Sequence, residues 1–105
     1  MKSILLLCNE GMSTGFLCNK MNEVAQTDNI AAKAWAIPES ALEGHYRTAD
    51  VIMVGPQISY LLDSIRQRVN DEIPVGAINP VDFGRINAKA VLDHALSLTE
   101  KQAAS

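Results

Sequence analysis

Apolar runs alternate with amphipathic stripes along this chain, and the alternation predicts strands followed by helices. Residues 3–7 form a continuous apolar run that leads into a Gly-containing segment, a pattern that favours a strand buried on both faces. A stripe at helical spacing follows, while the polar residues around it point elsewhere. Its members are Leu17, Cys18, Met21, Val24 and Ala25. The stripe predicts a helix over residues 14–27.

The same alternation continues to the end of the chain. Short apolar runs predict strands over residues 30–37, 50–54 and 73–78. Between them, residues 39–46 suit a brief helix, and Pro56 suits the first turn of a longer one. Two further stripes predict that longer helix and a last helix, separated by a loop from Asn79 through Gly84. They consist of Ile58, Leu61, Leu62, Ile65 and Val69, and of Ala88, Val91, Leu92, Ala95 and Leu96.

Strands that alternate with helices indicate an α/β fold with right-handed crossovers. We expect a three-layer sandwich in which helices cover both faces of a four-stranded parallel sheet. The 105 residues, 48% of them hydrophobic, suit one domain. We assign residues 1–100 to that domain and residues 101–105 to a frayed polar tail.

Charge and composition exclude several function classes. The net charge is −3 and the basic residues are scattered, so a nucleic-acid partner is not expected. No apolar run reaches the length of a membrane span or of a signal sequence, which predicts a cytoplasmic protein. In reducing cytosol, the two cysteines are expected to be free thiols.

The segment after the first strand is the strongest candidate for chemistry. Ligands of parallel sheets gather at the carboxyl ends of the strands, where Cys8 lies. The segment continues as Asn9, Glu10, Gly11, Met12, Ser13, Thr14 and Gly15. Its glycines permit close approaches, and its hydroxyls lie near the start of a helix, which favours an anion-binding loop. The same helix end favours a thiolate, the form of cysteine that attacks phosphorus.

Each cysteine has an alternative interpretation. Cys8 could be an ordinary buried residue at a strand end, because free cysteine is among the most buried residue types. The paired glycines and hydroxyls favour a functional role. Cys18 lies on the apolar stripe, so we interpret it as a small core residue, with a resolving thiol as the minor alternative.

The loop also resembles the Cys-x5-Arg loop of low-molecular-weight protein tyrosine phosphatases. Here Thr14 stands at the Arg position, and no Lys or Arg occurs from Cys8 to Asn19. A phosphoryl group would lack the charged clamp that stabilises phosphoryl transfer. This favours a phosphoryl relay over a Cys-dependent phosphatase or an arsenate-reductase-like enzyme, which remain the alternatives. A redox module lacks the support of a Cys-x-x-Cys pair.

Several residues outside the loop are candidates for support or docking. Gln57, at the end of the third strand, could bond the Cys8 loop or only help to start a helix. Tyr60 lies off its apolar stripe and is a candidate docking residue, although a surface Tyr packed on its neighbours is the commoner outcome. Asp82 is expected to cap a helix or approach the loop, with capping favoured. Neither histidine has a zinc-like spacing, so no metal or cofactor is expected.

Taken together, these segments resemble the enzyme IIB component of the lactose/cellobiose (chitobiose) class of the bacterial PEP-dependent sugar phosphotransferase system. The resemblance rests on the strand into Cys8, the Cys8 loop, the Gly55-Pro56-Gln57 segment and Asp82-Phe83-Gly84. It implies a fold like that of the small tyrosine phosphatases. It also implies that Cys8 accepts a phosphoryl group from a phosphohistidine of the IIA protein. Cys8 would then phosphorylate cellobiose or N,N′-diacetylchitobiose as the IIC membrane transporter, on which this chain would dock, carries the sugar.

Overall fold

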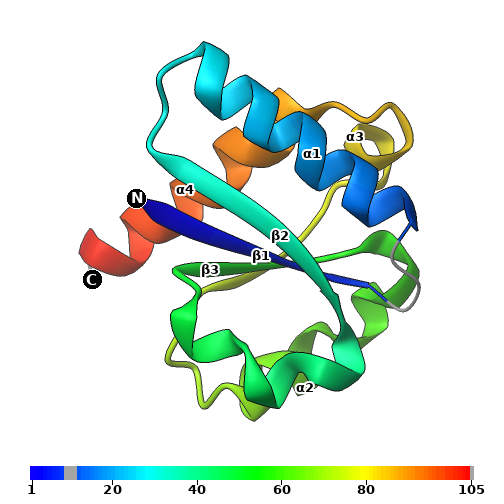
Figure 1. The fold of residues 1–105 in the computed structure, drawn as a ribbon. Helices are drawn as coiled ribbons and strands as arrows, with labels where there is room; N and C mark the ends of the chain where they lie inside the picture. The colour runs from blue at the N-terminus through cyan, green and yellow to red at the C-terminus, as the bar shows by residue number, and fades with distance from the viewer. Residues whose placement is uncertain (9–11, 105) are drawn as a thin grey trace.

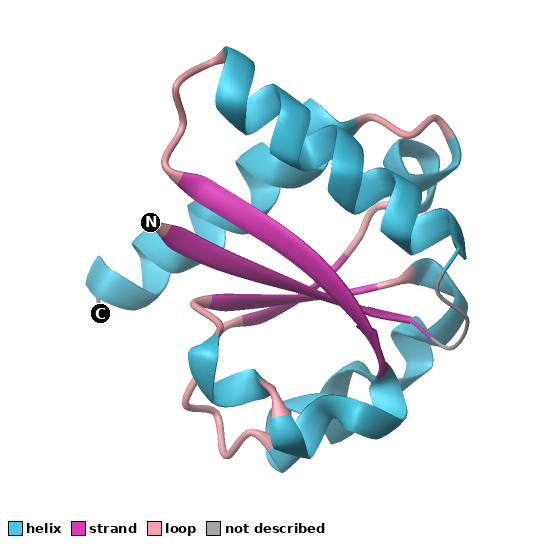
Figure 2. Cartoon of the chain, in the orientation of Figure 1, coloured by secondary structure: helices cyan, strands magenta, loops and turns pink. Residues whose placement is uncertain are grey.

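A four-stranded parallel sheet forms the centre of the molecule (Figures 1 and 2). The computed structural model describes the backbone of residues 1–8 and 12–104, and the side chains of residues 1–8 and 14–100. The strands are β1 (Lys2–Cys8), β2 (Ala32–Pro38), β3 (Val51–Val54) and β4 (Val75–Ala77), in the order β2-β1-β3-β4. Helices lie on both faces of the sheet, so the predicted fold class is confirmed.

β1 is buried because it lies between β2 and β3 and is covered on both faces. Residues 4–7 have no exposed surface, as the unbroken apolar run predicts. Their side chains alternate between two clusters: Ile4 and Leu6 pack on one face of the sheet, and Leu5 and Leu7 on the other. Because side chains alternate along a strand, the Cys8 side chain points to the same face of the sheet as Ile4 and Leu6.

Regular α-helices cover the first of these faces. They are α1 (Met12–Thr27) and α4 (Ala88–Ala104), with the short α3 (Pro80–Gly84) beside them (Figure 1). The stripe predicted for α1 is confirmed, since Leu17, Cys18, Met21 and Ala25 are all buried there. α1 begins two residues earlier than predicted. α4 extends beyond residue 100, the predicted end of the domain, and that boundary stays a prediction.

Short helices cover the other face. They are η1 (Glu39–Gly44), η2 (Tyr46–Thr48) and η3 (Pro56–Leu61), all 3₁₀-helices, and the α-helix α2 (Leu62–Arg68). The single helix predicted from the Ile58 stripe is therefore wrong, because the backbone is non-helical at Ile58 (φ −124°, ψ 22°). Arg68 of α2 bonds the carboxylates of Glu39 and Glu43, at 2.8 and 2.6 Å, and so joins α2 to η1.

The segment after β4 also departs from the predicted loop. It forms α3, whose N-cap is Asn79: its side-chain oxygen accepts the Val81 N–H at 2.8 Å and the Asp82 N–H at 3.4 Å. The prediction that Asp82 caps a helix is wrong, because Asp82 lies inside the first turn of α3. Within the described residues, no helix is both long and apolar enough to cross a membrane.

Candidate active site

Cys8 is the last residue of β1 and lies at the carboxyl edge of the sheet. Its side chain faces the layer formed by α1, and its Sγ is 3.8 Å from the Ile37 carbonyl oxygen of β2. The residue is 2% exposed, as the alternative of an ordinary buried cysteine expects. Burial alone therefore does not distinguish a structural Cys8 from a reactive one.

An open cavity of about 300 Å³ lies beside Cys8. It lies between the first half of α1 and the end of β2, and several of its walls are small side chains. The lining residues are Cys8, Gly15, Cys18, Asn19, Ala34, Trp35, Ala36, Ile37 and Pro38. Space for a small group therefore exists next to Cys8.

Cys18 borders the same cavity from the side of α1 and is buried, as predicted. Burial is the larger cause and the nearby Cys8 the smaller one, and together they raise the pKa of the Cys18 thiol to about 12. Cys18 is thus held as a neutral thiol at neutral pH, which makes it a poor nucleophile. This supports the interpretation of Cys18 as a core residue.

The first turn of α1 reaches this site through Gly15, which lines the cavity. Thr14 is buried next to it. A Cβ at Gly15 would meet no atom within 4 Å, and no described glycine has a positive φ. Gly15 is therefore not required by backbone conformation, and it leaves open space instead. Asn9, Glu10 and Gly11 lie outside the described residues, as do the side chains of Met12 and Ser13.

Gly55 and Gln57 lie near the end of β1. The Gly55 N–H donates to the Leu7 carbonyl at 2.9 Å, which joins the end of β3 to the residue before Cys8. A Cβ at Gly55 would lie 3.2 Å from both the Leu7 carbonyl oxygen and Gln57 Oε1. Gln57 Oε1 and the Leu7 carbonyl oxygen thus both lie near Gly55, and a role of Gln57 beside the Cys8 segment stays a prediction.

The comparisons with known proteins agree with this geometry. The family model of the lactose/cellobiose-specific IIB subunit of the PTS system matches residues 3–94. This chain belongs to that IIB family. It is 36% identical to the oligo-β-mannoside-specific EIIB component of Bacillus subtilis, across 97% of this chain and 100% of that protein. It is 30% identical to the cellobiose-specific EIIB component of Lactococcus lactis, across 92% and 95% of the two chains.

Solved structures give the same result. The cellobiose-specific IIB component of Borrelia burgdorferi superposes with a TM-score of 0.80 at 32% identity, covering 95% of this chain and 93% of that one. The lactose-specific IIB domain of Streptococcus pneumoniae shares the fold, with a TM-score of 0.82 at 18% identity over 91% and 95% of the chains. IIB subunits are phosphotransferases that pass a phosphoryl group toward sugar, and this IIB chain is such a subunit.

Exposed apolar side chains occur in the helices that follow three of the strands of this IIB subunit. Tyr60 of η3 is 80% exposed, Phe16 of α1 is 53% exposed and Val81 of α3 is 58% exposed. These elements follow β3, β1 and β4, so the three residues lie toward the edge of the sheet that carries Cys8. The sequence singled out Tyr60 but not Phe16 or Val81. For Phe16, the missed signal is its place off the stripe of Leu17, Cys18 and Met21.

Asp82 of this IIB subunit is half-buried in α3, and its carboxylate makes no hydrogen bond to a described residue. Among the side chains that the structure describes, no three His, Cys, Asp or Glu residues gather where they could bind one metal ion.

Proposed function

We propose that Cys8 is the phosphoryl-carrying residue of this IIB subunit. It accepts the group from a phosphohistidine of the IIA protein and passes it to a β-linked disaccharide that the IIC transporter carries. The observation that supports this best is the cavity where Cys8, at the end of β1, meets the first turn of α1. Cys18, the other thiol among the described residues that line that cavity, does not compete, because its pKa is about 12.

The chemistry consists of two displacements at phosphorus. In the first, the Cys8 thiolate attacks, an S–P bond forms, the N–P bond of the phosphohistidine breaks, and the imidazole keeps the electron pair. In the second, a sugar hydroxyl attacks, an O–P bond forms, the S–P bond breaks, and the hydroxyl proton is released as the thiolate returns. The positive end of α1 favours the anionic groups of both steps.

The absence of Lys and Arg between Cys8 and Asn19 fits a carrier better than a hydrolase. A phosphoryl group held by dipoles alone lacks the Lys or Arg clamp that stabilises the charge developing during its transfer. The partner proteins supply that stabilisation when they dock, so the phosphorylated subunit survives between partners. Asn9, Glu10, Gly11, Met12, Ser13, Thr14 and Gly15 form the proposed phosphate-binding segment, and Gln57 supports it from β3.

Docking on IIA and IIC must bring a reacting group to a sulfur that has little exposed surface. Protein interfaces are enriched in aromatic side chains at their centres. Tyr60, Phe16 and Val81 are exposed apolar groups around the edge of the sheet that carries Cys8. We propose that they contact both partners in turn, and that docking on IIC brings the subunit to the inner face of the membrane.

The acceptor sugar is proposed from the relatives. One relative is named as specific for oligo-β-mannoside and another as specific for cellobiose, and both sugars have β linkages. A β-linked disaccharide is therefore the proposed class, with cellobiose as the first sugar to test and N,N′-diacetylchitobiose as the second.

The experiment uses the two cysteines as a matched pair. Wild type, Cys8→Ser and Cys18→Ser are each incubated with phosphorylated IIA, and the intact mass is measured. Sugar phosphate is then measured with IIC-containing membranes and cellobiose. Wild type and Cys18→Ser should gain one phosphoryl group and support sugar phosphorylation, whereas folded Cys8→Ser should do neither. Phosphoryl acceptance by folded Cys8→Ser at the wild-type rate would overturn the proposal.

A further inference from the structure

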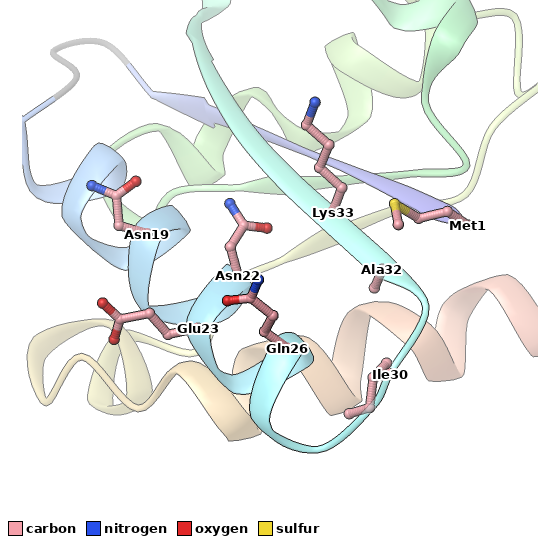
Figure 3. Close-up of a pocket in the computed structure, with 8 residues that line it drawn as sticks. All are labelled: Met1, Asn19, Asn22, Glu23, Gln26, Ile30, Ala32 and Lys33. Atoms are coloured by element: carbon pink, nitrogen blue, oxygen red, sulfur yellow. The ribbon is translucent and has the colours of Figure 1, made fainter.

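A side-chain amide joins α1 to the outer edge of β2. β2 pairs only with β1, and Asn22 of α1 bonds both backbone groups of Ala34 at the other edge. Its Oδ1 accepts the Ala34 N–H at 2.8 Å, and its Nδ2 donates to the Ala34 carbonyl oxygen at 3.0 Å. Figure 3 shows Asn22 reaching from α1 toward the strand that carries Ala32 and Lys33. Hydrogen bonds are directional and apolar packing is not, so this pair fixes the register of α1 along β2.

The Asn22–Ala34 pair lies at the far end of the Cys8 cavity. Ala34 lines that cavity, whereas Asn22 lines a separate groove of about 550 Å³ between α1 and β2. From Ala34 the cavity follows β2 to Pro38, which pairs with Cys8. Asn22 therefore joins the two walls of the cavity roughly 13 Å along the strand from Cys8.

Nearer to Cys8, side-chain packing does not set the distance between the two walls. Gly15 lines the cavity from α1, and a Cβ there would meet no atom within 4 Å. Among the side chains described in α1, none but Asn22 bonds to the sheet. α1 is a regular helix, and Gly15 lies about two turns, or roughly 10 Å, before Asn22. The place of its first turn beside Cys8 thus depends on where α1 is fixed at Asn22.

We propose that Asn22 is a positioning residue for phosphoryl transfer: its amide fixes α1 against β2 and so holds the first turn of α1 at the Cys8 sulfur. This inference rests on the proposed role of Cys8 as the phosphoryl carrier. A helix end stabilises an anion only within its first turn. A displacement of about 1 Å can lower a rate by about a hundredfold. Loss of the Asn22 bonds should therefore slow the transfer although Asn22 touches no reacting group.

The first measurement is the rate of phosphoryl acceptance from phosphorylated IIA. Asn22→Ala removes both bonds to Ala34, and the maximal rate should fall at least about tenfold. The concentration of phosphorylated IIA that gives half of that rate should change less than about twofold, because Asn22 is not one of the proposed docking residues. Gln26→Ala is the matched control. Gln26 lies one turn later on the same groove, its side chain bonds no described residue, and its loss should leave both quantities at wild-type values.

The second measurement needs no partner protein. Iodoacetamide and the bulkier iodoacetanilide carry the same reactive group, so the ratio of their rates at Cys8 does not depend on the thiolate fraction and reports the space beside the sulfur. In Asn22→Ala the ratio of the bulky to the small reagent should rise severalfold, because the wall formed by α1 is no longer fixed against β2. Peptide mapping by mass spectrometry follows the Cys8 peptide.

A further control separates positioning from loss of stability. Val69 is buried on the other face of the sheet, so Val69→Ala weakens the core without touching α1. While folded, it should keep the wild-type maximal rate and alkylation ratio. Asn22→Ser, whose side chain is too short to bond both Ala34 groups, replaces Asn22→Ala if the latter fails to fold.

The two proposals fail separately. An unchanged maximal rate or an unchanged alkylation ratio in the folded Asn22 variant overturns the positioning role, as does a loss that Val69→Ala reproduces. Phosphoryl acceptance by folded Cys8→Ser at the wild-type rate overturns the carrier role instead.

Discussion

The end of β1 and the middle of α1 each place a cysteine against the same cavity, but the two cysteines differ in their surroundings. Cys8 ends a strand at the sheet edge where ligands of parallel sheets bind, and it meets the first turn of a helix. Cys18 lies within the apolar stripe of α1, where burial raises its pKa to about 12. Position relative to the ends of the elements therefore separates a candidate nucleophile from a packing residue, although both cysteines are buried.

Thiol alkylation of Cys18 should show the largest effect. A pKa of about 12, against 9.0 for an ordinary cysteine, lowers the thiolate fraction near pH 8 by about a thousandfold. Alkylation of Cys18 by iodoacetamide should therefore be about a thousandfold slower in the folded protein than in urea. Peptide mapping by mass spectrometry measures both rates. Equal rates in the two states would show that the α1 region does not protect its cysteine.

Alkaline unfolding tests the same contrast through stability. The folded-state pKa of Cys18 lies above the unfolded value, so the neutral thiol stabilises the fold fully below pH 9. That contribution is lost as the pH rises from 9 through 12. The loss should approach about 4 kcal/mol at the upper end. Urea unfolding of wild type and Cys18→Ala across this range checks it: the free energy of unfolding of wild type relative to Cys18→Ala should fall as the pH rises, and a constant difference would contradict it.

Gly55→Ala tests how far the end of β1 depends on close backbone packing. The added Cβ would lie 3.2 Å from the Leu7 carbonyl oxygen, a backbone atom that cannot turn away. We expect a loss of about 1–3 kcal/mol in the free energy of unfolding, together with slower phosphoryl acceptance. Gly44→Ala is the control, since a Cβ there meets no atom within 4 Å. If the two variants are equally stable, β1 and β3 are not held closely at this point.

Gly15→Ala should have the smallest effect and the opposite sign. Gly15 lies inside α1 with open space around it, so alanine should stabilise the helix by about 0.5–1 kcal/mol. The methyl group narrows the cavity beside Cys8, so phosphoryl acceptance should fall while stability rises. Thermal unfolding and a phosphoryl-transfer assay measure the two quantities. Faster acceptance in the stabilised variant would argue against the cavity as the route to Cys8.

Periodicity predicted the parts of the fold whose burial is regular. The run into Cys8 and the stripe of α1 each bury one continuous surface, so β1, α1 and the position of Cys8 were predicted correctly. The break at Ile58 was not, because the apolar spacing continues although the backbone is non-helical at Ile58 and changes from 3₁₀- to α-helix only at Leu62. Asn22 looked like a solvent-facing residue, since its bonds to Ala34 join residues 12 apart in sequence.

The cap of α3 was predicted at the wrong residue. Asp82 and Asn79 are both good capping residues, and the sequence alone does not say at which residue α3 begins. Pro80, which suits the first helical position, was the signal that favours Asn79. Cys8 became a candidate because it lies at a strand end, whereas the cavity beside it depends on α1 and β2 together.

Direct mapping of the phosphoryl group tests the central claim most closely. Wild-type protein is phosphorylated by its phosphorylated IIA partner, digested under conditions that keep S–P bonds, and sequenced by tandem mass spectrometry. The account predicts the group on the peptide that contains Cys8, in about one copy per chain, with Cys18 unmodified. A phosphoryl group on His45, His94 or any other residue, with Cys8 recovered as a free thiol, would contradict it.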